Sequence, residues 1–519
     1  MNLRLKKRLI WILGSLLFLV GLTFVLNYSI EKSIKQGLKE LPETVKITYK
    51  YFSVNTLTGN LKLIEPTIQV YGKTRDTLNF KATLKSLSIE GFSYWTYFIN
   101  KKIAIDGLLL DEPKIIYYHN DLVEKKTYNN KFSKSLKYDI DIESLVLNDG
   151  FIRAYQVSND SLVLQSENIH LNLNDIIFNQ QGNKPEFSCK NYNFKNGKSF
   201  FNLNATENLT IKALDIDSEL VKITDLKLKT KYSKEALSKI IKFEKDHFEL
   251  QIDSIAIMHP DIGLNKDVFY DLKSPMATIY HADFDVYRDQ LLPDNKAYKA
   301  LYSKLLRELD FKFGFDFLNI ENTSISYVEK VDVNVKSGEL LFSEINAEIK
   351  NVGNIYNEKT YLDIDALFMK STPLHIEWDF DVNDKTDAFI FKSEFGRFAT
   401  ESLNQFMTPN LNIKLEGEVE KLFFTISGND VMSNIDAKIK YDNFDVIILR
   451  EDGREKNRLL SAVLNIFISK DSRDDAEKFS YGSKEGIERD KTKSMFCFVW
   501  ISLREALLSA VVGNGEKSD

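Results

Sequence analysis

The sequence predicts a mainly β protein, built as a long and mostly antiparallel sheet that follows one transmembrane helix. Three observations carry this prediction. The chain has 519 residues, of which 36 are Phe and 23 are Tyr, and aromatic residues favour strands. Apolar and polar residues alternate over most of the chain, as in "HLNLND" at 170–175. An eleven-residue frame recurs five times. Twenty or more strands are implied, so the sheet must close into a barrel, fold on itself or line a groove.

The recurring frame has Leu or Ile at its fourth, sixth and eleventh positions in every copy. The ninth position holds Pro66, Pro113, Gly150, Pro260 and Thr323. The copies are TGNLKLIEPTI (58–68), IDGLLLDEPKI (105–115), IESLVLNDGFI (142–152), IDSIAIMHPDI (252–262) and FDFLNIENTSI (315–325).

Strand geometry gives the frame an interpretation. Positions four and six lie two residues apart, so their side chains share one face of a strand. Proline donates no hydrogen bond to a ladder, so position nine is expected in a turn or at an edge. Each copy is therefore expected to cross the sheet, turn and cross back. The copies follow one another at irregular intervals, which indicates a decayed repeat with insertions.

The amino terminus predicts a membrane anchor. Residues 1–8 form a basic tail, and no charge occurs from Leu9 to Leu26. Eighteen helical residues span about 27 Å, close to the ~30 Å hydrocarbon core of a bilayer. A cleaved signal peptide is the competing interpretation, but no small-x-small site occurs near residue 28. The basic flank places the amino terminus in the cytoplasm. The anchor is expected at 9–28, with Leu9, Trp11, Leu16, Phe18, Phe24 and Leu26 facing lipid.

The remaining elements follow in order along the chain. An amphipathic linker helix is expected at 29–44, and an elongated β body at 45–468. Helical insertions are expected near 233–247, 294–309 and 399–408. A charged stretch at 469–493 is expected to be a flexible loop.

An amphipathic C-terminal helix, apolar on most sides, is expected within 494–519. Arg504 and Glu505 lie in the middle of this helix and argue against a second membrane span. The helix should pack on the end of the sheet or lie at a membrane surface. Its candidate contact residues are Phe498, Trp500, Leu503 and Leu507.

Composition and motifs argue against several functional classes. The net charge is −6 with mixed signs, which gives no nucleic-acid footprint. Cys189 and Cys497 are the two cysteines, so a disulfide framework is excluded, and the sequence assigns no role to either. Enzyme motifs are absent, and no two of the six histidines have helical metal-ligand spacing. We therefore expect no catalytic residues, no metal and no cofactor.

The apolar stripes of the strands are the candidate functional surface. They can form an ordinary closed core, or they can line an open conduit for apolar ligands. The acidic residue at frame position two, by contrast, is expected on the solvent face. The stripe residues are Leu61, Leu63, Leu108, Leu110, Leu145, Leu147, Phe248, Leu250, Ile252, Ile255, Ile257, Leu318, Ile320, Leu411, Ile413 and Leu415.

These features together resemble the AsmA-like proteins of diderm bacteria. The resemblance lies in the basic flank, the single anchor and the repeated units, and it is strongest in three segments: 84–118, 396–428 continuing into 440–449, and "FVWISLREALLSAVVG" at 498–513. It extends over nearly the whole chain, although each motif is degenerate. The resemblance implies a twisted sheet folded into an elongated, taco-like apolar groove, with the body in the periplasm and the anchor in the inner membrane.

The function that the resemblance implies is transfer of phospholipids between the inner and outer membranes, with acyl chains lying in the groove. The expected partners are phospholipids, the inner membrane and an outer-membrane or periplasmic protein. A scaffold that assists outer-membrane protein assembly, and binds proteins by edge pairing, is the alternative. The sequence does not identify the lipid, its direction of travel or the energy source.

Overall fold

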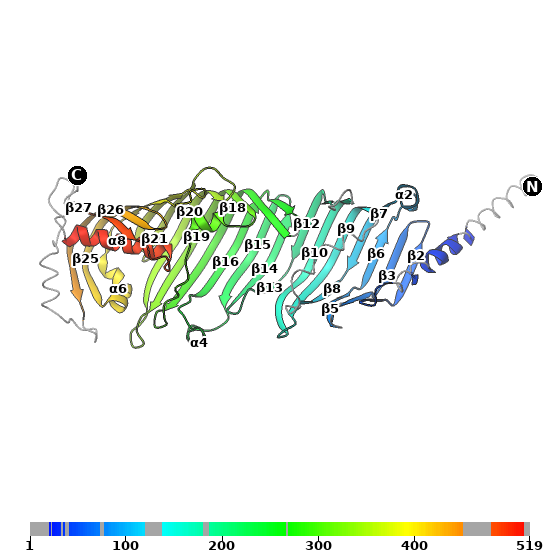
Figure 1. Ribbon diagram of the computed structural model, residues 1–519, viewed down its shortest axis with the longest axis horizontal. Helices are drawn as coiled ribbons and strands as arrows, with labels where there is room; N and C mark the ends of the chain where they lie inside the picture. Colours follow the sequence, from blue (N-terminus) through cyan, green and yellow to red (C-terminus); the bar gives the residue numbers. More distant parts are fainter. Residues whose placement is uncertain are drawn as a thin grey trace, which may run out of the picture. The chain divides into compact units, whose positions relative to one another are not determined.

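The computed structural model describes residues 20–21, 23–32, 35–36, 41–72, 77–119, 138–179, 186–265, 268–449 and 479–512. Its described residues form two compact units. Unit 1 comprises residues 1–205 and 209–218, and unit 2 comprises residues 206–208 and 219–519. Both units consist mainly of strands that run side by side (Figure 1).

The described residues of unit 1 form fourteen strands, the short helix α2 (Tyr94–Asn100) and helical turns within 20–36. The strands are β1 (Val45–Thr48), β2 (Tyr51–Asn55), β3 (Asn60–Ile64), β4 (Thr67–Tyr71), β5 (Leu78–Thr83), β6 (Ser86–Glu90), β7 (Lys102–Asp111), β8 (Lys114–His119), β9 (Asp139–Gln156), β10 (Ser161–Asn179), β11 (Glu186–Ser188), β12 (Asn191–Asn196), β13 (Ser199–Asn202) and most of β14 (Glu207–Asp217).

The described residues of unit 2 form thirteen further strands. They are β15 (Leu220–Thr230), β16 (His247–Met258), β17 (Asp261–Asn265), β18 (Val268–Asp289), β19 (Lys312–Lys330), β20 (Gly338–Gly353), β21 (Thr360–Phe368), β22 (Thr372–Phe380), β23 (Phe389–Phe395), β24 (Phe398–Ala399), β25 (Ile413–Gly428), β26 (Met432–Ile448) and β27 (Ser480–Glu488). Its helices are α4 (Lys234–Ile240), α5 (Tyr302–Arg307), the 3-10 turn η2 (Thr400–Leu403), α6 (Asn404–Leu411) and α8 (Met495–Val512).

The pairing is mixed, whereas the sequence predicts an antiparallel sheet. β7 and β8 run parallel to β9, and β18 runs parallel to β19. Parallel neighbours need a crossover that returns the chain to its starting edge, and residues 290–311 supply one between β18 and β19. The antiparallel prediction is correct for the other described pairs.

The repeated frame is a bulged, continuing strand, so the prediction that the chain turns and crosses back is wrong. β7 and β8 both pair with the same strand, β9, and the register continues unbroken from Asp111 opposite Asn148 to Lys114 opposite Phe151. Position eight adopts left-handed φ values near +50° in all five copies, at Glu65, Glu112, Asp149, His259 and Asn322. Position nine is buried in each copy. Because Glu112 and the facing Asp149 are both left-handed, the two strands share the irregularity and the register is kept. Proline is tolerated at such a break in the ladder.

A second irregularity occurs at frame position two. At this position the facing residues are not paired, although the residues on both sides of them are. This holds for Asp106 opposite Glu143, for Asp253 opposite His281, and for Asp316. Asp225 and His281, beside Asp253 on the flanking strands, have left-handed φ values of 48° and 49°. The four acidic residues are exposed as predicted, and the irregularity explains why the apolar positions change parity on either side of them. These irregularities form lines that cross neighbouring strands, which we call the bulge lines.

Two predicted helices are shorter than expected because tertiary contacts hold part of each segment extended. Within 294–309 only Tyr302–Arg307 is helical. Upstream of that helix, the Lys299 amide donates to the Lys491 carbonyl at 2.8 Å. Within 233–247 the helix ends at Ile240, and the Glu244 amide donates to the Pro293 carbonyl at 2.9 Å. The 399–408 insertion is confirmed as η2 followed by α6.

The charged segment at 469–493 is only partly as predicted. Ser480–Glu488 is strand β27, paired with β26, so the loop prediction is wrong for these residues. Small residues allow β27 to lie under α8: a Cβ added to Gly482 would lie 2.1 Å from the Ala506 carbonyl oxygen. The C-terminal helix is confirmed over Met495–Val512.

The predicted anchor lies largely outside the described residues, including Leu9, Trp11, Leu16 and Phe18. Phe24 and Leu26 belong to a described helical stretch and are 71% and 43% exposed. The expected linker helix at 29–44 is described only in part: it is helical at 29–32 and 35–36, but 41–44 is a turn, so the helix prediction is wrong for these last residues. In the described part of the chain, no helix combines the length and apolar character needed to cross a membrane.

Candidate functional site: paired apolar rows

Two continuous apolar rows cross unit 1 from strand to strand. Each step joins residues that are directly opposite in the pairing register. We call these the unit 1 rows. One row is Val54, Leu61, Ile89, Leu108, Leu145, Leu173 and Tyr192; the other is Phe52, Leu63, Leu87, Leu110, Leu147, Leu171, Phe194 and Ile216.

Unit 2 carries an equivalent pair, the unit 2 rows. Both begin on β15 and continue across β22. The first is Ile223, Ile255, Ile279, Ile320, Ala347, Ile364 and Ile376; the second is Val221, Ile257, Ala277, Leu318, Ile349, Leu362, Trp378, Phe391, Ile426 and Ile435.

The structure brings ten of the predicted stripe residues into these rows. Six lie in the unit 1 rows, namely Leu61, Leu63, Leu108, Leu110, Leu145 and Leu147. Four lie in the unit 2 rows, namely Ile255, Ile257, Leu318 and Ile320. The sequence analysis missed the partner strands, although the alternation of "SLSIEG" at 86–91 was available to find Leu87 and Ile89.

The other predicted residues lie elsewhere. Leu250 and Ile252 pair with β15 and β18, and Phe248 pairs with β18, on the other side of a bulge line. Leu411 ends helix α6 and is 46% exposed, so its assignment to a strand is wrong. Ile413 and Leu415 lie on β25 beside α6, where Asn404 bonds both the amide and the carbonyl of Leu415.

Burial differs sharply along the rows. Phe52 is 4% exposed, but the remaining unit 1 row residues are only half-buried. At the β22–β26 end of unit 2, Trp378 and Phe391 are 7% and 5% exposed, and Ile426 and Ile435 are fully buried. These four belong to a core that includes Phe498 and Leu503 of α8. In Figure 1, α8 lies across the strands of this end.

The predicted residues of the C-terminal helix fall on two faces. Phe498 and Leu503 are buried in the core, and Leu507 packs against it. Trp500 is 39% exposed, in a stripe with Phe496 and Leu508, which are 61% and 53% exposed. Lys493, just before the helix, bonds Asp294 at 3.1 Å and the buried Glu244 at 3.3 Å. The crossover between β18 and β19 therefore holds the start of α8 in place.

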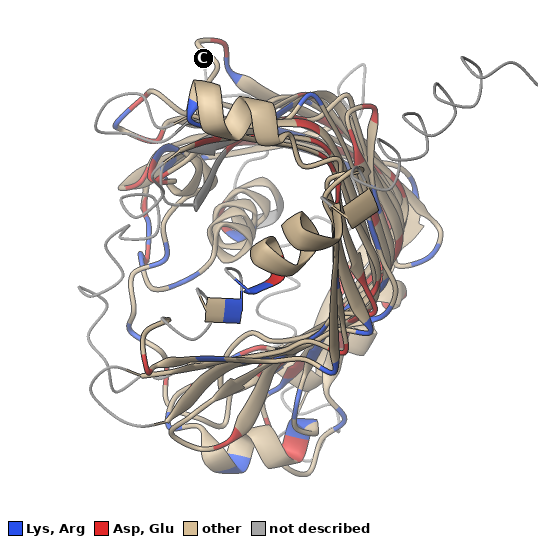
Figure 2. Ribbon diagram, turned by 90° about the vertical axis from the view of Figure 1, so that its right-hand side faces the viewer, with Lys and Arg blue, Asp and Glu red and all other residues tan. Residues whose placement is uncertain are grey.

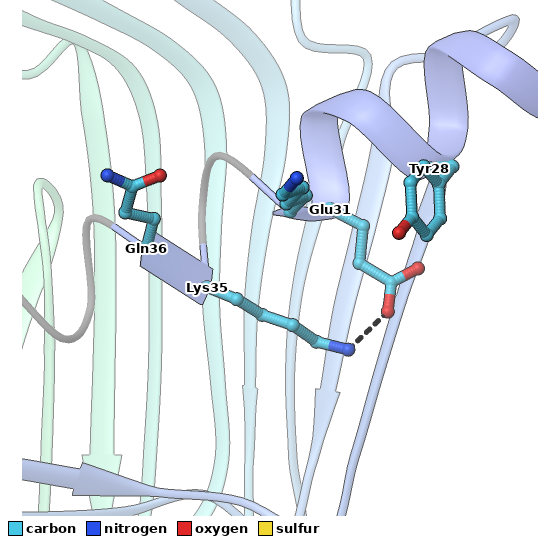
Figure 3. A pocket seen from close by; sticks show the side chains of 5 residues that line it. Tyr28, Glu31, Lys35 and Gln36 are labelled. Atoms are coloured by element: carbon cyan, nitrogen blue, oxygen red, sulfur yellow. Dashed lines mark hydrogen bonds and ion pairs between the residues drawn. The ribbon is translucent and has the colours of Figure 1, made fainter.

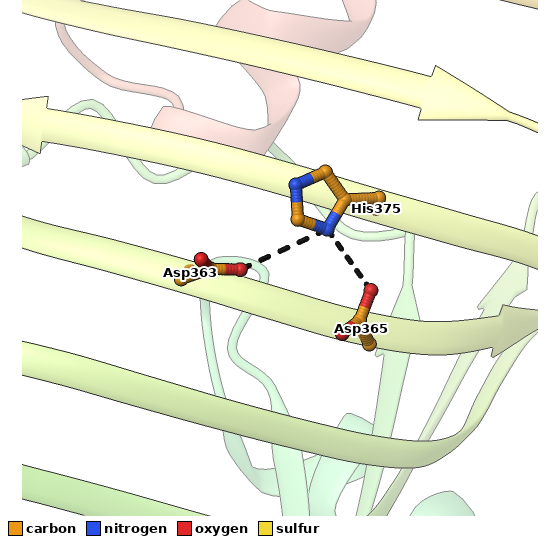
Figure 4. Close-up of side chains that lie close together, drawn as sticks. All are labelled: Asp363, Asp365 and His375. Carbon is orange, nitrogen blue, oxygen red and sulfur yellow. Dashed lines mark hydrogen bonds and ion pairs between the residues drawn. The ribbon is translucent and has the colours of Figure 1, made fainter.

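A small polar cluster on the opposite face of β21 and β22 is the described group that comes nearest to a metal site. His375 Nδ1 lies 2.9 Å from Asp365 and 3.7 Å from Asp363 (Figure 4). The bond from Asp365 raises the pKa of His375 despite partial burial. All three side chains are at least 40% exposed, and the imidazole already pairs with both carboxylates. This arrangement is that of a surface ion pair.

Two cavities are lined by residues that do not belong to the rows. One, of about 490 Å³, is lined by Tyr28, Glu31, Lys32, Lys35 and Gln36 of the N-terminal helical residues. Within it Lys35 and Glu31 form an ion pair of 2.5 Å (Figure 3). The other, of about 570 Å³, lies along the crossover at Phe243 and 293–297.

Neither cysteine has the lowered pKa of a reactive thiol, and charged residues form no cluster of one sign along the described strands. Burial raises the pKa of both Cys189 and Cys497, which is the opposite of nucleophile activation. Acidic and basic residues are interspersed along the strands (Figure 2). The paired apolar rows are therefore the most extensive candidate site in the described part of the chain. No family model matches the chain, and no curated protein matches it in sequence.

Proposed function

We propose that the apolar rows bind the acyl chains of lipids, and that the protein is a membrane-anchored lipid carrier of the bacterial envelope, of the AsmA-like kind. The observation that supports this most is the continuity of the rows: each step joins apolar residues directly opposite in the register, and the unit 1 rows are only half-buried. In this proposal the strands bend at the bulge lines to form a groove around the chains.

The dimensions of the rows suit acyl chains. The longer unit 1 row crosses eight strands, and seven spacings of about 4.8 Å give about 34 Å. This length is comparable to the ~30 Å hydrocarbon core of a whole bilayer, so it exceeds one acyl chain.

The proposed mechanism is physical. Each CH₂ group removed from water is stabilised by about 0.8 kcal/mol, so an uncovered lipid tail crosses water only at great cost. A continuous apolar row lowers that barrier, because the tail exchanges one apolar contact for the next. Headgroups stay in water. The rows supply no direction, so concentration differences or a partner must provide it. No catalytic residue, metal or cofactor takes part in this mechanism.

The proposal is tested by photo-crosslinking in living cells, with a photoreactive amino acid at Leu63 in unit 1 and at Ile364 in unit 2. The matched controls are the adjacent Lys62 and Asp363, which alternate onto the opposite face. Ile435 lies in the part of the unit 2 rows that α8 covers, which is not proposed to bind lipid, and it serves as a covered apolar control.

Phospholipid adducts at Leu63 and Ile364, with few at the three controls, are expected. Protein adducts at the row positions, without lipid, would instead favour the scaffold that assists outer-membrane protein assembly. Equal lipid labelling at Lys62 and Leu63 would contradict the proposal, because it would show that labelling does not depend on the apolar face.

A further inference from the structure

Helix α2 presents an apolar face that the rest of unit 1 leaves exposed. Trp95, Phe98 and Ile99 are 74%, 63% and 60% exposed. Their spacing of three and four residues places them on one side of the helix. None of the seven residues of α2 is buried. Such a group of large apolar side chains marks a surface that binds something.

The other side of α2 is firmly attached to the protein. Phe92 contacts Tyr94 and Tyr97 with ring centroids 5.0 and 5.7 Å apart, and Tyr97 contacts Tyr138 at 5.5 Å. The Ser93 side chain caps the helix by accepting from the Thr96 amide. The exposed face is therefore held in a fixed orientation while the aromatic cluster secures the helix.

The turn between β2 and β3 is joined to the base of α2. The Phe92 amide donates to the Gly59 carbonyl at 3.0 Å, and the Gly91 amide donates to Asn60 Oδ1 at 3.1 Å. A Cβ at Gly59 would lie 2.5 Å from the Phe92 carbonyl oxygen, so the contact requires glycine. This turn carries Leu57, the most exposed large apolar residue of the chain's described part, at 78%.

The same turn is joined to the N-terminal helical residues. The Thr56 amide donates to Asn27 Oδ1 at 2.7 Å. Asn27 directly follows the charge-free stretch from Leu9 to Leu26. The turn therefore lies at the level where that stretch ends, and the hydrogen bonds through Gly59 and Phe92 bring α2 to the same part of unit 1 (Figure 1).

We infer that α2 and the β2–β3 turn are seated in the interface of a lipid bilayer, with Trp95, Phe98, Ile99 and Leu57 among the headgroups. Two observations favour a bilayer over a protein partner. The apolar side chains are tethered to the end of a stretch long enough to span a bilayer, and they include tryptophan and phenylalanine, which suit the membrane interface. The inference does not require the apolar rows to carry lipid.

The test uses the full chain reconstituted in vesicles of phosphatidylethanolamine and phosphatidylglycerol that contain radiolabelled phosphatidylethanolamine. A benzophenone amino acid replaces Phe98 in one variant and Leu57 in another. The control position is Val333, which is 71% exposed in the β19–β20 connection. We expect lipid adducts at Phe98 and Leu57, and background labelling at Val333.

A second variant guards against local unfolding. Trp95→Ser combined with Phe98→Ser should lower the lipid adduct at Leu57 by roughly tenfold, while circular dichroism of the chain stays unchanged. Labelling at Phe98 no higher than at Val333, or crosslinks to a second protein chain, would overturn the inference. This test is separate from the test of lipid carriage. Adducts at Leu63 and Ile364 report on lipid in the rows, whereas adducts at Phe98 and Leu57 report on contact of α2 and the β2–β3 turn with the bilayer.

Discussion

The unit 1 rows and the β22–β26 end of the unit 2 rows have the same apolar alternation but different burial. Leu145 and Leu147 of β9 are half-buried, whereas Ile426 and Ile435 of β25 and β26 are fully buried. The difference comes from α8, whose Ala506 and Ala510 are 0% and 3% exposed. Alternation therefore predicts which face of a strand is apolar, and a separate element decides whether that face is a closed core.

The largest expected effect comes from deleting side chains in the covered region. Ile426→Ala should lower the free energy of unfolding of unit 2 by about 3–4 kcal/mol, because it removes a buried side chain and leaves a cavity. The matched change in the half-buried rows, Ile89→Ala, should cost about 1 kcal/mol. Urea unfolding of both variants measures the difference.

If Ile426→Ala and Ile89→Ala lowered the free energy of unfolding by similar amounts, the two regions would not differ in burial as described. Such a result would mean that something covers the unit 1 rows as fully as α8 covers β25 and β26. A small loss of stability in Ile89→Ala together with a large loss in Ile426→Ala would support the difference in burial.

A smaller effect should follow from separating α8 from β27. Gly482→Ala would place a Cβ 2.1 Å from the Ala506 carbonyl oxygen and 2.6 Å from the Ala510 amide nitrogen. The helix must shift, at a cost of about 1–3 kcal/mol. Gly107→Ala is the control, since its Cβ would meet only Glu90, at ordinary contact distances.

The measurement for this pair is thermal unfolding combined with tryptophan fluorescence, to which Trp500 of α8 and Trp378 of the adjoining core both contribute. Gly482→Ala should lower the melting temperature and change the tryptophan signal, and Gly107→Ala should do neither. A neutral Gly482→Ala would show that α8 is not the element that closes this end.

The smallest effect is expected on the polar face of the strands. Asp365 raises the pKa of His375 above 6.5, so this pair stabilises the fold below the ordinary histidine pKa. The contribution is lost as the pH rises through the folded pKa. Because His375 is 40% exposed, Asp365→Asn should cost only about 0.2–0.5 kcal/mol at low pH, and nothing at high pH.

An NMR titration of His375 in both proteins checks this directly, and the variant should titrate at lower pH. A larger loss of stability, or one that persists at high pH, would show that the polar face contributes to stability through more than this pair.

The sequence predicted the mainly β class, the C-terminal helix and which strand positions are apolar. It could not predict the direction of the chain after position nine. Pro66 and Pro113 are equally compatible with a tight turn and with a bulge, since both remove a ladder hydrogen bond. The left-handed backbone of the residue before each proline produces the irregular strand seen here. Glutamate rarely adopts this conformation, so Glu112 gives no sign of it in the sequence.

The parallel strand pairs and the non-helical part of the crossover also could not be predicted from the sequence. The pattern at 294–309 is helical, and its first half is extended because of contacts with residues far along the chain. Lys299 bonds Lys491, and Glu244 bonds Pro293. Local periodicity contains no information about such partners. For the candidate site, single strands could be marked as apolar, but their order in a row depended on the pairing.

The bulge lines have a consequence for how such a protein can grow. Each copy of the repeated frame carries its own left-handed residue and its own buried residue after it, as at Glu65–Pro66 and Glu112–Pro113. The bend is therefore encoded one strand at a time and does not depend on a distant partner. A duplicated strand pair would arrive with its bends already in place and extend the rows by two steps. The number of strands can then change through evolution without new bends having to be encoded elsewhere in the chain.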